Sequence, residues 1–171
     1  MPIATVTVAA SDHFRNVGST AFRWTVVKPA AIGKPRTRSV KFSGLGKGKP
    51  KLTFTIDAGS HAPALKSVSV SLPRGLSFAK KTKTLDKGIG IRSGGRKVKF
   101  RVKLSKSVLR ISFKSAVRTA SLSIGAPVIS VSGSEASKIR NHKVKKLTVS
   151  LKTTDTSHKT VKLGLTLKKL S

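Results

Sequence analysis

The sequence predicts an all-β protein built as an antiparallel β-sandwich, and three observations lead to this fold class. Apolar residues alternate with polar residues over short runs, which is the period of a strand with one buried face. Glycine- and proline-rich breaks separate these runs. Helical periodicity is almost absent. About eight or nine such strands follow residue 38, which is enough for a complete sandwich.

Each element can be placed from its local pattern. Residues 3–27 predict one hairpin, and residues 28–38, with two prolines and clustered basic residues, predict an extended linker. Beyond the linker, the alternation predicts strands at 51–57, 67–72, 96–104, 108–113, 118–125, 147–153 and 160–168. Gly94 and Gly95 predict a tight hairpin turn. Ser132 and Glu135 fit a capping box, which predicts one short helical turn.

The hairpin pattern occurs twice. Residues 5–26 and 147–167 each contain an alternating strand, an aspartate, a short polar break and a second alternating strand. If 39–171 is one sandwich that closes with this hairpin, then 3–27 corresponds to the last two strands of another sandwich. We therefore expect a terminal hairpin of a truncated domain at 1–27, a linker at 28–38 and a complete domain at 39–171.

Two short segments resemble a known family. The stretch TVTVAASDHFRNVGSTAFRWTV, at 5–26, resembles the closing hairpin of immunoglobulin-like (cadherin-like) domains of bacterial surface proteins, which have a T-V-T-V-x-A-x-D hairpin and an F-x-W-T-V strand. LPRGLSF, at 72–78, is similar to the L-P-x-G-L-x-F turn of the same group. The domain at 39–171 resembles the Lys-rich C-terminal domains of large exported actinobacterial proteins. The resemblance implies an immunoglobulin-like sandwich on an exported protein, with neighbouring immunoglobulin-like domains as partners in the same chain.

Charge is the most unusual property of the composition. The chain has 36 lysines and arginines against 5 acidic residues, a formal net charge of +31. Such a chain repels itself unless anions surround it. It has no cysteine, which excludes thiol chemistry and sulfur metal sites. No apolar run is long enough to span a membrane, and the first residues lack the pattern of a signal peptide. If the native protein is exported, we expect this chain to be a part of it.

The sequence predicts no catalytic, cofactor or metal site. Asp12 and Asp155 occupy equivalent places in the two hairpins, but calcium takes six to eight oxygens including several carboxylates. With so few, scattered acids, we expect turn aspartates that bond to nearby backbone N–H groups. The histidines show no metal-ligand spacing, and His13 and His158 are expected at surface turns. The Gly- and Lys-rich stretch 43–51 lacks the pattern of a phosphate-binding loop and predicts a flexible strand connection.

The aromatic residues are predicted to belong to the core. Phe22 and Trp24 share strand parity with Val26, and most phenylalanines fall on the apolar side of alternating runs. A platform for stacking nucleic acid bases would instead place aromatic side chains among the basic residues.

The basic residues predict salt-sensitive, sequence-independent affinity for polyanions. The candidate binding residues are Lys97, Lys99, Arg101, Lys103, Lys143, Lys145, Lys146, Lys168 and Lys169. The predicted function is a non-catalytic structural or adhesion module of a secreted or cell-surface protein, with anionic cell-wall glycopolymers or lipid headgroups as partners. The alternative is a basic nucleic-acid-binding protein of ribosomal or chromatin type with non-specific contacts. An enzyme is disfavoured, because no acid, base and nucleophile converge in the sequence.

Overall fold

The computed structural model describes residues 3–11, 17–25 and 29–167, and the chain divides into two compact units, Met1–Ala31 and Ile32–Ser171. In the first unit, β1 (Ile3–Ser11) pairs antiparallel with β2 (Val17–Thr25), in a register from Ile3 opposite Thr25 to Ser11 opposite Val17. The predicted hairpin is therefore present. Its origin as the end of a truncated sandwich stays a prediction, and Asp12 and His13 lie outside the described residues.

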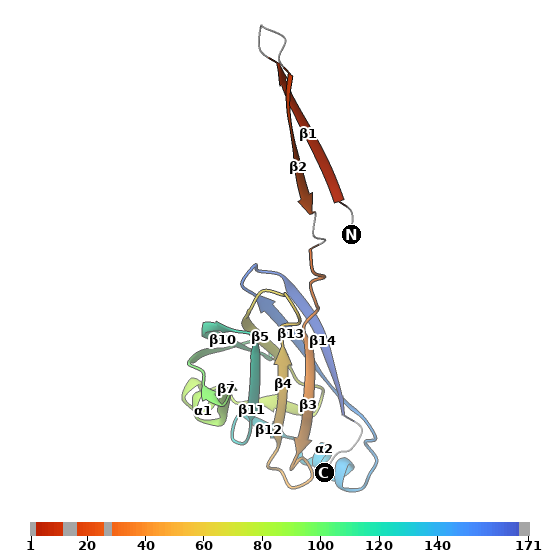
Figure 1. Ribbon diagram of the computed structural model, residues 1–171. Helices are drawn as coiled ribbons and strands as arrows, with labels where there is room; N and C mark the ends of the chain where they lie inside the picture. Colours follow the sequence, from red (N-terminus) through yellow and green to blue (C-terminus); the bar gives the residue numbers. More distant parts are fainter. Residues whose placement is uncertain (1–2, 12–16, 26–28, 168–171) are drawn as a thin grey trace. The chain divides into compact units, whose positions relative to one another are not determined.

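The second unit is the predicted antiparallel β-sandwich, with two five-stranded sheets (Figure 1). The first, called here the β4 sheet, has the order β3 (Arg36–Ser43), β4 (Lys51–Asp57), β11 (Thr119–Ile124), β7 (Ile89–Ser93) and β8 (Arg96–Lys97). The second, called the β5 sheet, has the order β14 (Thr160–Leu167), β13 (Leu147–Asp155), β5 (Leu65–Ser71), β10 (Val108–Val117) and β9 (Phe100–Ser105). A further pair joins β12 (Ile129–Val131) to β6 (Leu76–Phe78). Strand β3 begins at Arg36, within the range 28–38 expected to be a linker.

The strand order has the form of an immunoglobulin constant-type domain. Taken in chain order, β3, β4, β5, β7, β11, β13 and β14 occupy the places of strands A to G, so the two sheets contain the orders A-B-E-D and G-F-C. The largest addition to this plan is a hairpin in the second sheet. The hairpin of β9 and β10 follows the D strand and extends the second sheet beyond its C strand.

The core lies between the two sheets and follows from the alternation in the sequence. Along β13, every second residue from Leu147 to Asp155 is buried, and the residues between them are exposed or half-buried. Strand β4 likewise buries Leu52, Phe54 and Ile56. Each large aliphatic or aromatic side chain removed from water contributes about 1.5–3 kcal/mol to folding. Phe42, Phe54, Phe78 and Phe113 are buried, and Phe100 is partly buried against the same core, which agrees with the core prediction for the phenylalanines of this unit.

Two short helices accompany the sheets. Helix α2 (Gly133–Arg140) confirms the predicted helical turn, and the hydroxyl of Ser132 accepts a hydrogen bond from the backbone N–H of Glu135 at 3.3 Å. The reciprocal half of the capping box is replaced, because the backbone N–H of Ser132 donates to the carbonyl of Gly75. Helix α1 (Thr82–Gly88) was not predicted. It buries only Leu85, so it leaves no helical period in the sequence. In the described part of the chain, neither helix has the length and apolar character that crossing a membrane requires.

Two tight hairpin turns share one geometry but differ in sequence. Gly94 and Gly95, between β7 and β8, have φ values of +54° and +79°, which confirms the predicted turn. Lys106 and Ser107, between β9 and β10, have φ values of +46° and +67°. Two successive positive φ values define a type I′ turn, which favours asparagine and glycine. The second turn therefore holds two residues in a conformation that side chains rarely adopt.

Replacing Ser107 with glycine is expected to stabilise the protein. The substitution removes the steric penalty of the left-handed conformation, partly offset by the larger backbone entropy of glycine in the unfolded chain. We expect a gain of about 0.5–1 kcal/mol in the free energy of unfolding. Urea unfolding followed by circular dichroism measures it. Gly95→Ser in the other turn is the matched control and should shift the midpoint in the opposite direction; equal signs would contradict the explanation.

Candidate polyanion-binding face

The outer surface of the β5 sheet carries a row of four basic side chains. In this row Lys162 lies opposite Lys152 on the neighbouring strand, and Arg110 lies opposite Lys103. Ser69 of the central strand separates the two pairs, because it is the partner of both Lys152 and Arg110. We call Lys162, Lys152, Arg110 and Lys103 the cationic row. Since neighbouring strands are about 4.8 Å apart, the row spans about 19 Å across the five strands.

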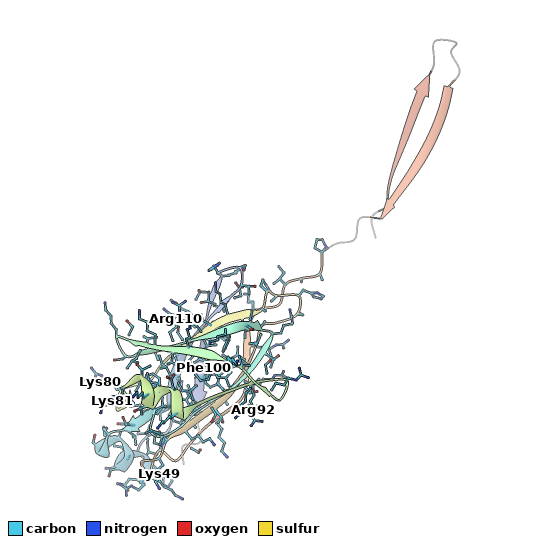
Figure 2. All side chains as sticks on the ribbon, turned by 90° about the vertical axis from the view of Figure 1, so that its left-hand side faces the viewer. Lys49, Lys80, Lys81, Arg92, Phe100 and Arg110 are labelled. Carbon is cyan, nitrogen blue, oxygen red and sulfur yellow. The ribbon has the colours of Figure 1, made fainter. Side chains whose placement is uncertain are left out.

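The strand period points the cationic row away from the core. Each of its members lies between two residues that face the other sheet, such as Leu151 beside Lys152 and Ile111 beside Arg110. Leu151 and Ile111 are buried, whereas all four basic residues are exposed. Figure 2 shows the side chains of the second unit and labels Arg110. The sandwich core therefore fixes the backbone positions of the row, and the charged ends remain in water.

Small residues flank the cationic row on the central strands. The next row toward one end of the strands contains Gly164, Ser150, Ser71, Val108 and Ser105, and the next row toward the other end contains Thr160, Thr154, Ser67, Ser112 and Arg101. Further along, the backbone N–H of Lys114 on β10 donates to the carbonyl of Lys99, just before β9, which places another basic pair beside these rows. Among the described residues, no carboxylate lies on these rows. The face is positively charged and rich in serine and threonine, of which Ser67 is buried.

This arrangement is electrostatically unfavourable in the isolated protein. Lys152 opposite Lys162 and Arg110 opposite Lys103 are like-charge cross-strand pairs, and such pairs destabilise a sheet by a few tenths of a kcal/mol each. No described carboxylate stands between them. A bound polyanion would convert this repulsion into attraction, and it would release counterions at the same time.

On the outer surface of the β4 sheet, in contrast, one basic side chain is paired with a carboxylate. It also carries a cross-strand row with basic residues, in the order Arg38, Thr55, Ser121, Arg92 and Lys97. Here one cation is neutralised within the protein, because Nη2 of Arg38 donates to Oδ1 of Asp57 at 2.9 Å and its Nε forms an ion pair with Oδ2. The β5 sheet is therefore the stronger candidate for binding an anionic polymer.

The predicted binding residues occupy several places. Lys99 and the β9 residues Arg101 and Lys103 keep the expected alternation, and only Lys103 belongs to the cationic row. The single strand predicted at 96–104 is wrong, because Lys97 pairs with Arg92 in the β4 sheet, whereas β9 belongs to the β5 sheet. Three of the remaining candidates are exposed in the loop before β13: Lys143, Lys145 and Lys146. The other two, Lys168 and Lys169, lie outside the described residues.

Sequence reasoning missed three members of the cationic row. Lys152, Lys162 and Arg110 each stand alone in an alternating strand, without the local cluster that draws attention to 97–103. Their strand parity was visible, since Arg110 and Lys162 each fall between two apolar residues and Lys152 follows Leu151. Their common row was not visible, because it depends on the pairing of β5 with both β13 and β10.

Asp155 and His158 lie in one turn, in agreement with the roles predicted for them. Oδ1 of Asp155 accepts hydrogen bonds from the backbone N–H of Lys159 at 2.9 Å and from the hydroxyl of Ser157 at 2.8 Å, which confirms it as a turn aspartate. His158 is exposed at φ +63° in the same turn, as predicted. Among the described residues, no three histidine, aspartate or glutamate side chains group as metal ligands would.

Comparison with known proteins gives similar solved structures but no matching family model. No family model matches the chain, and curated proteins give no significant match. Among solved structures, the collagen binding domain of the Erysipelothrix rhusiopathiae surface protein RspB is similar at 10% identity and a TM-score of 0.41, over 95% of this chain and 56% of that chain. A DUF4466 family protein from Parabacteroides merdae gives 9% identity and a TM-score of 0.39, over 95% of this chain and 42% of that chain. This chain thus spans about half the length of these neighbours. At these identities and TM-scores, neither likeness says what this chain binds.

Proposed function

We propose that this protein is a non-catalytic module of an exported or cell-surface protein, and that the outer face of the β5 sheet binds anionic wall glycopolymers. The observation that carries the proposal is the cationic row. It places Lys162, Lys152, Arg110 and Lys103 in one line, with no described carboxylate on the same face. The exported location rests on the sequence resemblance of 5–26 and 72–78 to domains of bacterial surface proteins.

Binding of this kind needs no enclosed pocket. A flexible polymer with one negative charge per repeat can lie across the strands and contact successive basic side chains. Phosphate- and carboxylate-bearing polymers suit both lysine, as a point charge, and arginine, as a planar donor. Flanking serines and threonines offer hydroxyl groups for further hydrogen bonds to the polymer.

A non-catalytic role fits the state of three of the five acidic residues. Asp57 is held by Arg38 and Thr119, Asp155 by its own turn, and Glu135 by an ion pair with Lys138 at 3.6 Å. Each of these carboxylates thus has a structural partner.

Sedimentation with purified bacterial cell walls tests the proposal. The walls are compared with walls stripped of their anionic glycopolymers, over a series of salt concentrations. We expect strong retention at low salt that falls steeply as salt rises, because counterion release drives the binding. Equal retention by stripped walls, retention that ignores salt, or no retention at low salt would reject it.

Two parallel samples separate the other anionic partners. Vesicles with and without anionic lipid test the headgroup alternative, and double-stranded DNA tests the nucleic acid alternative. We expect retention on walls to survive in salt that releases the protein from both. Tighter binding to DNA or to anionic vesicles than to walls would transfer the function to those partners.

A further inference from the structure

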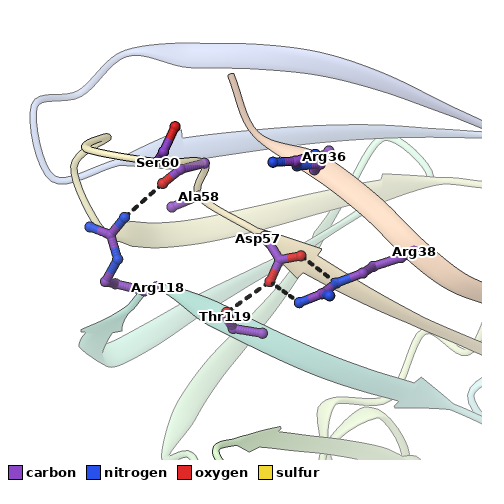
Figure 3. Close-up of a pocket in the computed structure, with 8 residues that line it drawn as sticks. Arg36, Arg38, Asp57, Ala58, Ser60, Arg118 and Thr119 are labelled. Carbon is purple, nitrogen blue, oxygen red and sulfur yellow. Dashed lines mark hydrogen bonds and ion pairs between the residues drawn. The ribbon is translucent and has the colours of Figure 1, made fainter. Parts of the chain in front are cut away.

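A second cationic site lies on the β4 sheet, apart from the cationic row. It is a hollow of about 380 Å³ lined by three arginines, Arg36, Arg38 and Arg118, together with Asp57, Thr119 and residues 58–60 (Figure 3). We propose that this hollow, which we call the arginine pocket, binds a single tetrahedral oxyanion, the sulfate or phosphate group of an ester.

One side of the arginine pocket is fixed by a charged network. Arg36, Asp57 and Thr119 are cross-strand partners on β3, β4 and β11, so the sheet sets their spacing. Asp57 accepts hydrogen bonds from Arg38 at 2.9 Å and from the Thr119 hydroxyl at 2.8 Å. The Arg38 guanidinium is thereby held at the edge of the pocket, and the Asp57 carboxylate is turned toward its partners.

Another side is fixed by backbone carbonyls. Arg118 lies between β10 and β11, where the chain passes from one sheet to the other. Its Nη1 donates to the carbonyl of Ala62 at 2.8 Å, and its Nη2 donates to the carbonyl of Gly59 at 2.6 Å. A guanidinium has five N–H donors, so these two bonds position the group and leave donors for a ligand. A fixed guanidinium loses little entropy when it binds an oxyanion.

Arg36 supplies the third guanidinium. It is exposed, and within the described residues no side-chain acceptor is recorded for it. Three guanidiniums and one carboxylate leave the arginine pocket with two excess positive charges, which matches a dianion. Arginine donors fit the oxygens of phosphate and sulfate in a forked geometry. Ser60 also lines the hollow.

The charge of the arginine pocket is constant near neutral pH. Partial burial raises the pKa of Asp57. The hydrogen bonds from Arg38 and Thr119, together with the charges of Arg38 and Arg36, outweigh this effect, so the pKa of Asp57 lies below its ordinary value. Asp57 therefore stays ionised above pH 5, and arginine does not titrate in this range. Binding by the pocket should then follow the ionisation of the ligand.

The arginine pocket and the cationic row are independent. Their residues belong to opposite sheets, except Arg118 at the crossing between them. The pocket can be tested with small anions that do not bridge several charges of a flat face. If experiments reject binding at one of these sites, the proposal for the other site still stands.

The test is a titration of the full chain with a phosphate monoester and, separately, with sulfate, at constant ionic strength in chloride. Amide chemical shifts from two-dimensional NMR report where each anion binds. We expect saturable shifts at Ala58, Gly59, Ser60 and Thr119. Arg36→Gln should weaken binding of both anions about tenfold, since it removes charge-assisted hydrogen bonds. Arg92→Gln makes the same change on the same sheet outside the pocket and should leave the affinity unchanged.

The pH dependence distinguishes the anions. A phosphate monoester gains its second charge with a pKa near 6, whereas sulfate remains a dianion. Between pH 5 and 7.5, the phosphate affinity should rise several-fold more than the sulfate affinity. Sulfate also controls for any change in the charge of the protein itself over this pH range. Shifts spread over all basic residues, or equal weakening by Arg36→Gln and Arg92→Gln, would overturn the proposal and leave the three arginines a structural role.

Discussion

Replacing Lys152, Lys162 and Arg110 together with glutamine is expected to reduce binding to a soluble anionic polymer about 100-fold at moderate ionic strength. Each basic residue near an anionic surface contributes about 1 kcal/mol, so three should contribute about two orders of magnitude in affinity. The dependence of log affinity on log salt concentration should also become shallower, by about 2, as three fewer charges are neutralised. Fluorescence anisotropy with labelled linear polyphosphate over a salt series measures both effects.

A matched variant on the other sheet decides whether position or net charge matters. Lys41, Arg92 and Lys97 lie exposed on the β4 sheet and also comprise two lysines and one arginine. Their replacement with glutamine lowers the net charge by the same amount. If both triple variants lose affinity equally, the protein binds through its overall charge and the β5 face has no special role.

Thermal unfolding separates loss of binding from loss of folding. The β5 variant removes two like-charge cross-strand pairs, so its melting temperature should stay the same or rise. A lower melting temperature would indicate structural damage. The single substitution Lys162→Gln, on the edge strand β14, then provides a milder test of the same face.

The fold could be predicted because most strands bury one face and leave the other in water. The alternation in β13 and β4 is visible in the sequence, and the same alternation appears in the burial of the structure. Turn residues were equally informative where glycine marked the turn, as at Gly94 and Gly95. The turn at Lys106 and Ser107 could not be predicted, because neither residue type indicates a positive φ. Helix α1 left no signal because a single buried leucine defines no period.

The candidate site could be predicted only in part. Local sequence shows the side of a strand to which a basic residue belongs, as for Lys103 on β9. It does not show which residues share a row, since Ser69, Arg110 and Lys152 are brought together by strand pairings between distant segments. The arginine pocket depends in the same way on the crossing at Arg118 and on the end of β4 at Asp57.

The substitution Leu45→Ala is expected to destabilise the sandwich by about 2–5 kcal/mol, the usual range for removing a buried leucine from a core. Leu45 lies in the Gly- and Lys-rich connection between β3 and β4, yet it is fully buried and belongs to the core cluster. The connection is closed by a hydrogen bond from the backbone N–H of Lys49 to the carbonyl of Gly44 at 2.9 Å. It is thus an anchored hairpin loop. Urea unfolding followed by far-ultraviolet circular dichroism measures the loss.

The probe and the controls for Leu45→Ala follow from the structure. Circular dichroism is the chosen probe because the single tryptophan, Trp24, belongs to the first compact unit and not to the sandwich. Lys47→Ala, at an exposed position of the same loop, should change stability by less than about 0.5 kcal/mol.

Gly44→Ala should destabilise the protein more than Gly48→Ala. Both glycines have positive φ, but an added Cβ at Gly44 would meet the Lys49 carbonyl, whereas Gly48 has open space. Similar stability of Leu45→Ala and Lys47→Ala would show that this loop contributes little to the stability of the core.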